Sequence, residues 1–356
     1  MARTPTVNNE GNIEWTEKAS SPDGDNLVIS LKLDAVDSGS GFVQQNVDSS
    51  NLNWIDYSTS STINSNGSRD VDSVIEVDPS GVDAGKNYRF EIHASDKALT
   101  SERSFILKVA ASKVVDGTRL FLLSENSGTI HENDLSTEWD ITTANEVDST
   151  GTNITRSHGL EFSLDGSKLF ITDSDNSDLA EFNLSSWNIS SISEVQSVNI
   201  GTEPSGVSLK DGTKFFIVRE AGYVDSYTLS SEYDISTLSS ENTLDVTSED
   251  TFMQDIAFKT DGGKMYLIGG ASDNVFQYNL NANWNITSAS FSNSLDISSK
   301  EGNPEGLEIK DDGSKVYICG SRVHSYEMST KWDLSTASFE NTLSRPEDLT
   351  SIGFGI

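Results

Sequence analysis

The feature that most limits the possible folds is a block that recurs five times after residue 113. Its full form reads GLEFSLDGSKLFI from Gly159 and GLEIKDDGSKVYI from Gly306, with an Asp-Gly pair near its centre. A second marker, an aromatic residue before Asp/Asn-Ile/Leu-Ser/Thr, follows each copy. The two markers share a spacing of 46 to 51 residues: Asp116, Asp165, Asp211, Asp261 and Asp312 for the first, and Trp139, Trp187, Tyr233, Trp284 and Trp332 for the second. Two independent markers with one period indicate repeated structural units.

Each unit contains four short apolar runs that alternate with polar residues and are separated by turn residues. In the second copy these runs are residues 160–164, 168–172, 179–184 and 194–200. The Asp-Gly pair between the first two runs is a typical hairpin turn, because both residue types tolerate positive φ. Four strands in about 50 residues match one blade of a β-propeller. Stacked helical repeats are excluded, since the apolar residues show no 3.6-residue period.

The two ends of the repeat region predict how the ring closes. The first copy, VVDGTRLFLL from Val114, lacks the opening strand that the other copies carry before Asp-Gly. The sequence LTSIGFGI from Leu349 resembles that missing strand. We therefore expect an all-β fold in which the C-terminal strand completes the first blade beside residues 119–123. This pairing gives a closed five-bladed propeller without an exposed sheet edge.

Residues 1–110 lack the Asp-Gly-x-Lys marker, and we expect them to form a separate domain. Alternating runs at residues 27–33, 88–94 and 105–109 are separated by glycine-containing turns, which predicts a β-sandwich of about 100 residues. The segments from Gly85 to Asp96 and from Arg103 to Val109 resemble the last two strands of cadherin-like and bacterial Ig-like domains. The resemblance implies a spacer or docking module at residues 1–110, followed by the propeller at residues 111–356.

The charge balance restricts the expected partners. Asp and Glu outnumber Lys and Arg 56 to 24, which gives a net charge of −32. Such a surface repels nucleic acids and anionic membranes, so neither is an expected partner. Acidic surfaces suit salt-rich surroundings, where screening shortens the reach of like-charge repulsion, and we interpret the composition as marine or halophilic.

Neither a leader nor a membrane span is predicted. The start, MARTPT, continues into polar sequence without an apolar core, so we expect synthesis in the cytoplasm without a signal peptide. No run approaches the roughly 20 apolar residues of a membrane span. The one cysteine, Cys319, excludes an internal disulfide, and its place in the second strand of the last blade predicts a small buried hydrophobic side chain.

The repeat has a family resemblance in addition to its fold signal. Its DGxKxY/F core resembles the YVTN and lactonase-like propeller repeats. With the LSxxWDIS element added, it is similar to the repeats of phage virion and tail-fibre-type proteins from saline waters. The resemblance covers the propeller and implies its fold, whereas function must come from a site, because propellers include hydrolases, lectins and scaffolds.

The repeats do not indicate a catalytic site. A propeller glycosidase needs two carboxylates at a set separation around the central tunnel. The aspartates of the Asp-Gly turns recur in equivalent places, and a residue that every blade repeats is structural, whereas a catalytic residue should break the repeat. We therefore expect that the chain is not an enzyme. The alternative is a glycan- or lactone-acting hydrolase.

Metal sites are also weakly indicated. No zinc site is predicted, because the chain has one cysteine and four histidines without paired spacing: His93, His131, His158 and His324. The oxygen ligands of Asp173, Asp175 and Asp178 have calcium-like spacing but lack the glycine and the closing Glu of an EF-hand. We expect a solvated loop there, with a weak calcium site as the alternative, and no other cofactor.

Comparison of the blades indicates one variable face. Loops between the first and second and between the third and fourth strands are nearly invariant, whereas the remaining loops differ in every blade. Varied loops on a rigid frame are typical of recognition. This face carries few cationic or aromatic residues, and we take these as candidate ligand-binding residues: Arg156, Arg219, Tyr223 and Arg322. An arginine there could bind a carboxylate or a sugar acid. The alternative is that these arginines neutralise nearby acids.

Together these patterns favour a non-enzymatic structural protein of a tailed-virus virion. Residues 1–110 would attach to other virion proteins, and the propeller would face outward towards a host glycan or a host surface protein. A head decoration or vertex position and a tail-fibre or baseplate position are equally compatible with the sequence. Symmetric particles carry several copies of each component, so we expect a homo-oligomer on the virion surface. A cellular surface adhesin is a further alternative.

Overall fold

The computed structural model describes residues 116–355 except 126, 164–165, 186, 202, 211 and 346–347, and within residues 1–108 it describes only the backbone of the strands. The chain forms two compact units, Met1–Ser112 and Lys113–Ile356. Each unit is described by itself.

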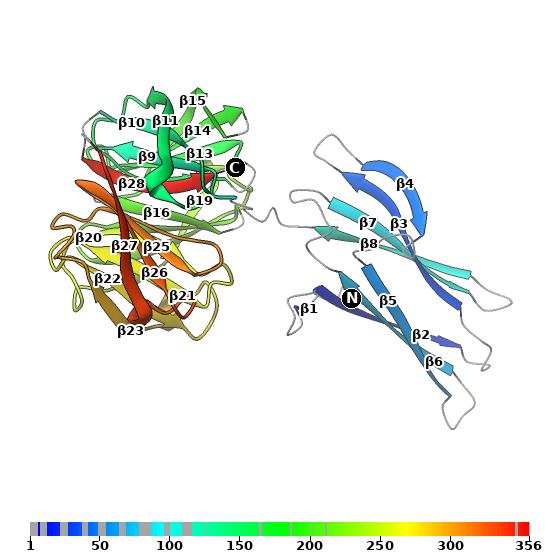
Figure 1. The fold of residues 1–356 in the computed structure, drawn as a ribbon. Helices are drawn as coiled ribbons and strands as arrows, with labels where there is room; N and C mark the ends of the chain where they lie inside the picture. The colour runs from blue at the N-terminus through cyan, green and yellow to red at the C-terminus, as the bar shows by residue number, and fades with distance from the viewer. Residues whose placement is uncertain are drawn as a thin grey trace. The chain divides into compact units, whose positions relative to one another are not determined.

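The described strands of the first unit form two four-stranded antiparallel sheets, with the orders β1-β2-β6-β5 and β4-β3-β7-β8 (Figure 1). Their bounds are β1 (Thr6–Val7), β2 (Ile13–Ser21), β3 (Val28–Asp37), β4 (Phe42–Asp48), β5 (Ile55–Ile63), β6 (Arg69–Val77), β7 (Asn87–Ser95) and β8 (Thr100–Lys108). The runs expected at residues 27–33, 88–94 and 105–109 correspond to β3, β7 and β8. The Ig-like sandwich stays a prediction, because the side chains that would form its core lie outside the described residues.

The second unit consists of five four-stranded antiparallel sheets around a common axis, so the predicted all-β, five-bladed propeller is confirmed (Figure 1). The blades, from the inner strand outward, are β28-β9-β10-β11, β12-β13-β14-β15, β16-β17-β18-β19, β20-β21-β22-β23 and β24-β25-β26-β27. Each inner strand lies beside the inner strands of both neighbouring blades.

The strands of the first two blades are β28 (Leu349–Gly355), β9 (Arg119–Ser124), β10 (Thr129–Leu135), β11 (Ala144–Gly151), β12 (Ser157–Phe162), β13 (Lys168–Asp173), β14 (Asp178–Ser185) and β15 (Asn188–Asn199). Those of the third and fourth are β16 (Pro204–Lys210), β17 (Lys214–Arg219), β18 (Tyr223–Leu229), β19 (Leu238–Asp245), β20 (Met253–Phe258), β21 (Lys264–Gly269), β22 (Asn274–Leu280) and β23 (Ala289–Asp296). The fifth blade has β24 (Gly306–Ile309), β25 (Lys315–Cys319), β26 (Arg322–Met328) and β27 (Ala337–Ser344). Short 3-10 helices precede four outer strands: η3 (Ile141–Thr143), η4 (Ile235–Thr237), η5 (Ile286–Ser288) and η6 (Leu334–Thr336).

The ring closes as the sequence predicts. Strand β28 pairs with β9, and Ile352 lies opposite Leu122 while Phe354 lies opposite Leu120. The ring of Phe354, 1% exposed, packs 4.7 Å from Trp139 of its own blade and 4.6 Å from Tyr317 of the fifth blade. The C-terminal strand therefore fills the first blade and joins it to the last.

Both repeat markers serve the same local structure. Each aromatic residue of the second marker has φ between 59° and 63°, and its ring lies over the glycine of the Asp-Gly turn in its own blade. The backbone N–H of Trp187, for example, donates to the carbonyl of Gly166 over 2.8 Å. The next residue then caps the following turn, as Asp140 does by accepting from the backbone N–H of Thr142 over 3.0 Å. The second marker is thus a clamp that holds the loop between strands three and four on the turn between strands one and two.

The Asp-Gly aspartates are structural where the structure describes them. Asp116, Asp261 and Asp312 each accept a hydrogen bond of 2.8 to 3.0 Å from a backbone N–H two residues later. Asp165 and Asp211, which the sequence analysis placed in the same turns, lie outside the described residues.

Replacement of one clamp aromatic should destabilise the propeller strongly. Trp187 is 3% exposed and packs 5.0 Å from the ring of Phe162. We expect Trp187→Ala to lower the free energy of unfolding by about 3–5 kcal/mol, because it leaves a large cavity between two hairpins. The half-buried Trp332 is the comparison, and Trp332→Ala should cost less. Urea unfolding measures both, and equal small losses would contradict the clamp role.

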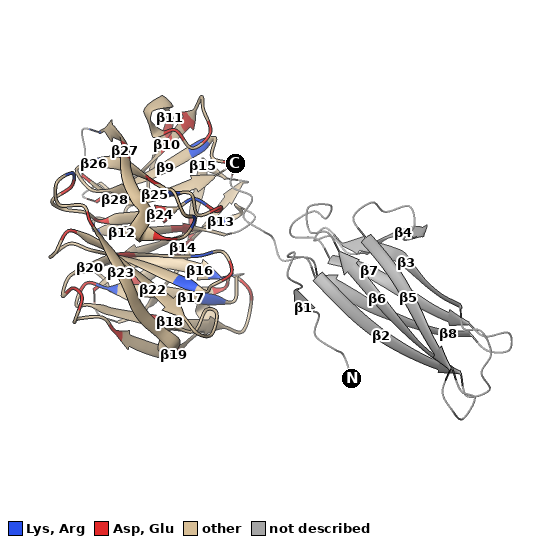
Figure 2. Ribbon diagram, turned by 60° about the horizontal axis from the view of Figure 1, so that its bottom comes forward, with Lys and Arg blue, Asp and Glu red and all other residues tan. Residues whose placement is uncertain are grey.

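Charged residues are spread widely over the described part of the propeller, and its cysteine is buried. Asp and Glu (red in Figure 2) are spread over strands and loops of several blades rather than gathered on one element. Cys319 is free and fully buried, as expected, and burial raises the pKa of its thiol well above the ordinary value. Among the described residues no helix is both long and apolar enough to cross a membrane.

Candidate active site at the mouth of the propeller axis

The inner strands of the five blades begin with residues that differ from blade to blade. Their register with the second strands makes Leu160, Val207, Ile256, Leu307 and Ile352 equivalent. Two residues earlier in each blade stand His158, Ser205, Gln254, Glu305 and Thr350, all at most 8% exposed. The apolar position is therefore uniform. The position two residues earlier, which we call the mouth of the axis, carries a different residue type in each blade.

The layer between these two positions is tightly packed. It consists of Gly159, Gly206, Asp255, Gly306 and Ser351. A Cβ on Gly159 would lie 2.7 Å from the backbone of the next inner strand, and one on Gly306 would lie 2.8 Å from Cα of Ser351. Glycine is therefore required where neighbouring inner strands approach most closely.

Asp255 is the exception within this layer. Its two carboxyl oxygens accept from the backbone N–H of Ile256 over 2.8 Å and from that of Leu307 over 2.9 Å. The side chain is fully buried, and burial raises the pKa of its carboxyl well above the usual range. We interpret Asp255 as a structural link between the fourth and fifth blades.

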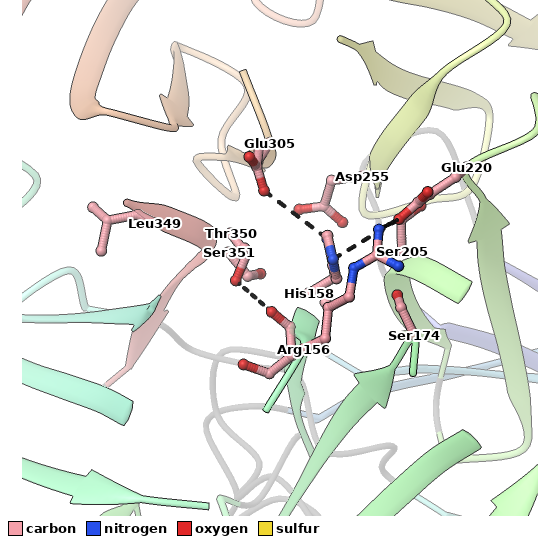
Figure 3. Close-up of polar contacts among 12 residues, drawn as sticks. Arg156, His158, Ser174, Ser205, Glu220, Asp255, Glu305, Leu349, Thr350 and Ser351 are labelled. Atoms are coloured by element: carbon pink, nitrogen blue, oxygen red, sulfur yellow. Dashed lines mark hydrogen bonds and ion pairs between the residues drawn. The ribbon is translucent and has the colours of Figure 1, made fainter. Parts of the chain in front are cut away.

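His158 lies between two carboxylates at the mouth (Figure 3). Its Nδ1 is 3.9 Å from Oε2 of Glu305, and its Nε2 is 3.9 Å from Oε1 of Glu220. Both separations exceed hydrogen-bond length. Arg156 forms an ion pair of 2.7 Å with the same Oε1 of Glu220. Nε2 of His158 and Oε2 of Glu305 are buried and make no hydrogen bond within the described structure.

The backbone and one amide hold this group in place. The N–H of Glu305 donates to the carbonyl of Cys319 over 2.8 Å, and Nδ2 of Asn303 donates to Oε1 of Glu305 over 2.5 Å. The N–H of Glu220 donates to the carbonyl of Glu203 over 3.1 Å. Glu305 is thus positioned by one carboxyl oxygen while the other faces the imidazole.

Burial controls the protonation of both central groups. Burial, helped by the nearby positive charge of Arg156, lowers the pKa of His158 to about 4. Burial, together with the negative charges of Glu125 and Asp348, raises the pKa of Glu305 to about 7. Burial also raises the pKa of Glu220, although Arg156 opposes that shift. Near neutral pH the imidazole is therefore uncharged, and Glu305 exchanges its proton readily.

The hydroxyl groups at the mouth are engaged elsewhere. Ser205 Oγ donates to the carbonyl of Met253 over 3.0 Å, Thr350 Oγ1 donates to that of Ser157 over 2.9 Å, and Ser174 Oγ donates to that of Pro204 over 2.5 Å. None of these hydroxyls has a hydrogen bond to His158 in the described part of the chain. The arrangement favours acid–base chemistry on water over attack by a serine or threonine.

A stability measurement tests the raised pKa of Glu305. The unfolded carboxyl has the ordinary value of 4.5 and the folded one a pKa of about 7. Between these values the folded state binds more protons, so this group lowers the free energy of unfolding as the pH rises. We expect Glu305→Gln to be more stable than the parent by about 3 kcal/mol at pH 8 and about equal to it at pH 4.

Chemical denaturation at the two pH values gives the comparison. Gln keeps an oxygen acceptor for Asn303, so loss of that contact does not confuse the result. A stability difference between variant and parent that does not change with pH would contradict the assignment.

The structure places the four candidate ligand-binding residues in three different settings. Arg156 lies in the site through its ion pair with Glu220. Arg219 pairs with Asp225 over 2.8 Å, and its guanidinium lies 4.6 Å from the ring centre of Tyr223. Arg322 is exposed, and its backbone N–H donates to Glu301 over 3.2 Å. Arg219, Tyr223 and Arg322 thus share the variable loops but have no described contact with His158.

The calcium candidates make separate local contacts. Asp173 accepts from the side-chain amide of Asn176 over 2.8 Å, Asp175 accepts from Thr155 over 3.1 Å, and Asp178 accepts from Ser197 over 2.8 Å. Over the described residues no group of three or more His, Cys, Asp or Glu side chains could hold a metal ion.

Sequence reasoning missed Glu220 and Glu305, and it considered His158 only as a metal ligand. The available signal was the alignment of the five inner strands by their apolar position, which places His158 and Glu305 where other blades have Ser, Gln and Thr. The Asp-Gly turns, by contrast, are the uniform part of each blade and therefore do not mark the site.

Comparison with known proteins gives only distant likenesses. No family model matches the chain, and no curated protein matches it. Among solved structures, a 6-phosphogluconolactonase candidate from Bacteroides uniformis is 14% identical, with 92% of this chain and 99% of that chain covered and a TM-score of 0.41. The periplasmic gluconolactonase PpgL from Pseudomonas aeruginosa is 12% identical, with 93% and 99% covered and a TM-score of 0.39. The C-terminal WD40 domain of Sif2 is 15% identical, with 67% and 61% covered and a TM-score of 0.33.

The expectation that the chain is not an enzyme is corrected, because it was based on the repeated turns alone. Two of these similar structures have lactonase names, at 14% and 12% identity. Within the chain itself, the mouth of the axis holds the buried His158 and Glu305, which do not belong to the repeated turns. The physical reason for the error is that these two titratable groups stand at non-repeating positions near the starts of the inner strands β12 and β24.

Proposed function

We propose that the propeller is a hydrolase that opens small cyclic esters at the mouth of its axis. The observation that carries this proposal is the buried pair of His158 and Glu305, each with a polar atom that makes no hydrogen bond to any described residue. Leaving such atoms buried without a partner costs about 1–3 kcal/mol each. Buried polar groups with shifted pKa values are typical of functional sites. A carboxyl with a pKa of about 7 is well matched to general base catalysis at neutral pH.

The proposed reaction uses water as the nucleophile. The Glu305 carboxylate accepts a proton from the water molecule as its oxygen forms a bond to the carbonyl carbon of the lactone. The uncharged His158 donates an N–H hydrogen bond to the carbonyl oxygen as negative charge develops there. The ring C–O bond then breaks, and the proton returns from Glu305 to the departing alkoxide, which yields a hydroxy acid.

The geometry favours a cyclic ester over a glycoside. A glycosidase places the scissile bond between two carboxyl groups. Here the imidazole of His158 stands between Glu220 and Glu305, 3.9 Å from each. Glu220 is also held by Arg156 over 2.7 Å, which suits a positioning residue for the imidazole rather than an acid that reacts with a sugar.

Product formation tests the proposal. Purified protein would be incubated at pH 7.5 with five- and six-membered lactones and, separately, with chromogenic aryl glycosides, and acid release or chromophore release would be followed. We expect hydrolysis of lactones and no hydrolysis of glycosides. Absence of lactone hydrolysis across the panel, or turnover of the glycosides alone, would overturn the proposal.

The location and the partners stay predictions. We keep three of them as proposals: attachment to virion proteins through residues 1–110, a location on the virion surface, and a homo-oligomer. Co-sedimentation of residues 1–112 with purified particles, with residues 113–356 as the comparison, would test the attachment.

A further inference from the structure

The mouth of the axis carries several carboxylates besides those beside His158. Glu125 follows β9, and its backbone N–H donates to the carbonyl of Asp348 over 3.3 Å. Glu203 precedes β16, and its backbone carbonyl accepts from the N–H of Glu220 over 3.1 Å. The negative charges of Glu125 and Asp348 help to raise the pKa of Glu305. Those of Glu125 and Glu203 help to raise the pKa of Glu220. Loops of three blades therefore bring acidic side chains to one place.

Positive charge at the mouth is small by comparison. The positive charge of Arg156 lowers the pKa of both His158 and Glu220. Its guanidinium is bound to Glu220 at 2.7 Å. His158 is uncharged near neutral pH, because burial lowers its pKa to about 4. Asp175 adds a further negative charge that acts on the imidazole. The field at the mouth is therefore negative.

The acidic residues alone would not define a ligand site, but the buried atoms beneath them do. His158 is 4% exposed and Glu305 8% exposed, and each has a polar atom without a hydrogen bond next to these carboxylates. The charges of Glu125 and Asp348 act on Glu305 and that of Glu203 acts on Glu220, so a ligand that reaches those two atoms enters the field of these carboxylates. Of these, Glu203 and Asp348 are exposed and can meet an entering molecule.

We infer that this site selects substrates with a positive charge, such as a lactone bearing a protonated amine, and rejects phosphorylated or carboxylated lactones. This inference rests on the proposed function. Two unit charges attract or repel appreciably within about 10 Å near a protein surface, and salt screens the effect beyond that distance. Several carboxylates of one sign act together, so the preference should exceed about tenfold in affinity at low salt.

Binding of lactams tests the inference without turnover, because a cyclic amide has the shape of the lactone but is not hydrolysed under assay conditions. The probes are a six-membered lactam, its amino-substituted form and its carboxy-substituted form. Calorimetry on the full chain at pH 7 and 20 mM NaCl should give the tightest binding for the amino form and the weakest for the carboxy form. The ratio of the two affinities should fall when the NaCl concentration is raised to 500 mM.

Two double variants make the test specific. Glu203→Gln with Asp348→Asn should lower the ratio of amino to carboxy affinity by about tenfold. Glu138→Gln with Glu232→Gln removes two exposed carboxylates that precede the clamp aromatics and should leave the ratio unchanged. Tighter binding of the carboxy form, no binding of any probe, or equal effects of the two double variants would overturn the inference. Selective amine binding without lactone hydrolysis would support the inference and refute the proposed reaction instead.

Discussion

A chain lacking residues 352–356 is expected to lose the cooperative unfolding transition of its propeller. The deletion removes Ile352 and Phe354, 2% and 1% exposed, and it leaves most of β9 without its inner partner. Each buried side chain of this size stabilises a core by about 2–5 kcal/mol, and the total approaches the stability of a whole domain. The unpaired edge of β9 should also promote aggregation.

Calorimetry and light scattering of the truncated protein provide the measurement. Removal of residue 356 alone is the matched control, because it leaves every pairing between β28 and β9 intact. A truncated protein that melts within a few degrees of the parent would show that the ring does not depend on this strand.

Loss of lactone hydrolysis in Glu305→Gln is the second large effect that we expect. Removing a general base lowers the rate by about 10²–10⁴-fold. His158→Leu should lower kcat/KM by about 10²–10³-fold, because the developing negative charge loses its hydrogen-bond donor. Both variants should still unfold cooperatively, and Glu305→Gln should be at least as stable as the parent, so that the loss is chemical.

Glu132→Gln is the matched control for these variants. Glu132 is 7% exposed on β10, and burial raises the pKa of its carboxyl as it does for Glu305. It pairs with Arg119 over 3.1 Å and has no described contact with His158. Activity should therefore remain at the parent level in this variant, and a similar loss there would mean that the effects arise from stability.

The architecture of the propeller could be predicted because its signals are local and repeated. The Asp-Gly turns mark the first hairpin of each blade, and the clamp aromatics mark the second loop. Alternation of apolar residues places the strands: the second copy was expected at residues 160–164, 168–172, 179–184 and 194–200, and the structure has β12, β13, β14 and β15 there. Closure followed from the mismatch between the first copy and the last strand.

The site could not be predicted in the same way, because its residues meet only through the ring. His158 and Glu305 are separated by most of the propeller sequence, and the fold brings them within 3.9 Å. Their altered pKa values arise from burial, which alternation alone does not reveal for the polar first residues of a strand. Arg156 was selected as a cation on the variable face, whereas its contact with Glu220 gives it a role in the site.

The positive φ of the clamp aromatics was also beyond the sequence pattern. Trp139, Trp187, Tyr233, Trp284 and Trp332 all adopt the left-handed region, which bulky residues rarely occupy. Stacking of each ring on a glycine and the N–H bond to that glycine's carbonyl offset the local cost. Such a compensation depends on contacts between two hairpins and is not visible in either hairpin alone.

The measurement that tests the central claim most directly is the pH dependence of kcat/KM for lactone hydrolysis by the parent protein between pH 5 and 9. His158 stays uncharged over this range, since its pKa is about 4. Glu305 must be ionised to accept a proton from water, and its pKa is about 7. We therefore predict that kcat/KM rises with pH, follows one ionisation near pH 7 and levels off above pH 8. A profile that is flat from pH 5 to 8, or a rise of the same size in Glu305→Gln, would contradict the account.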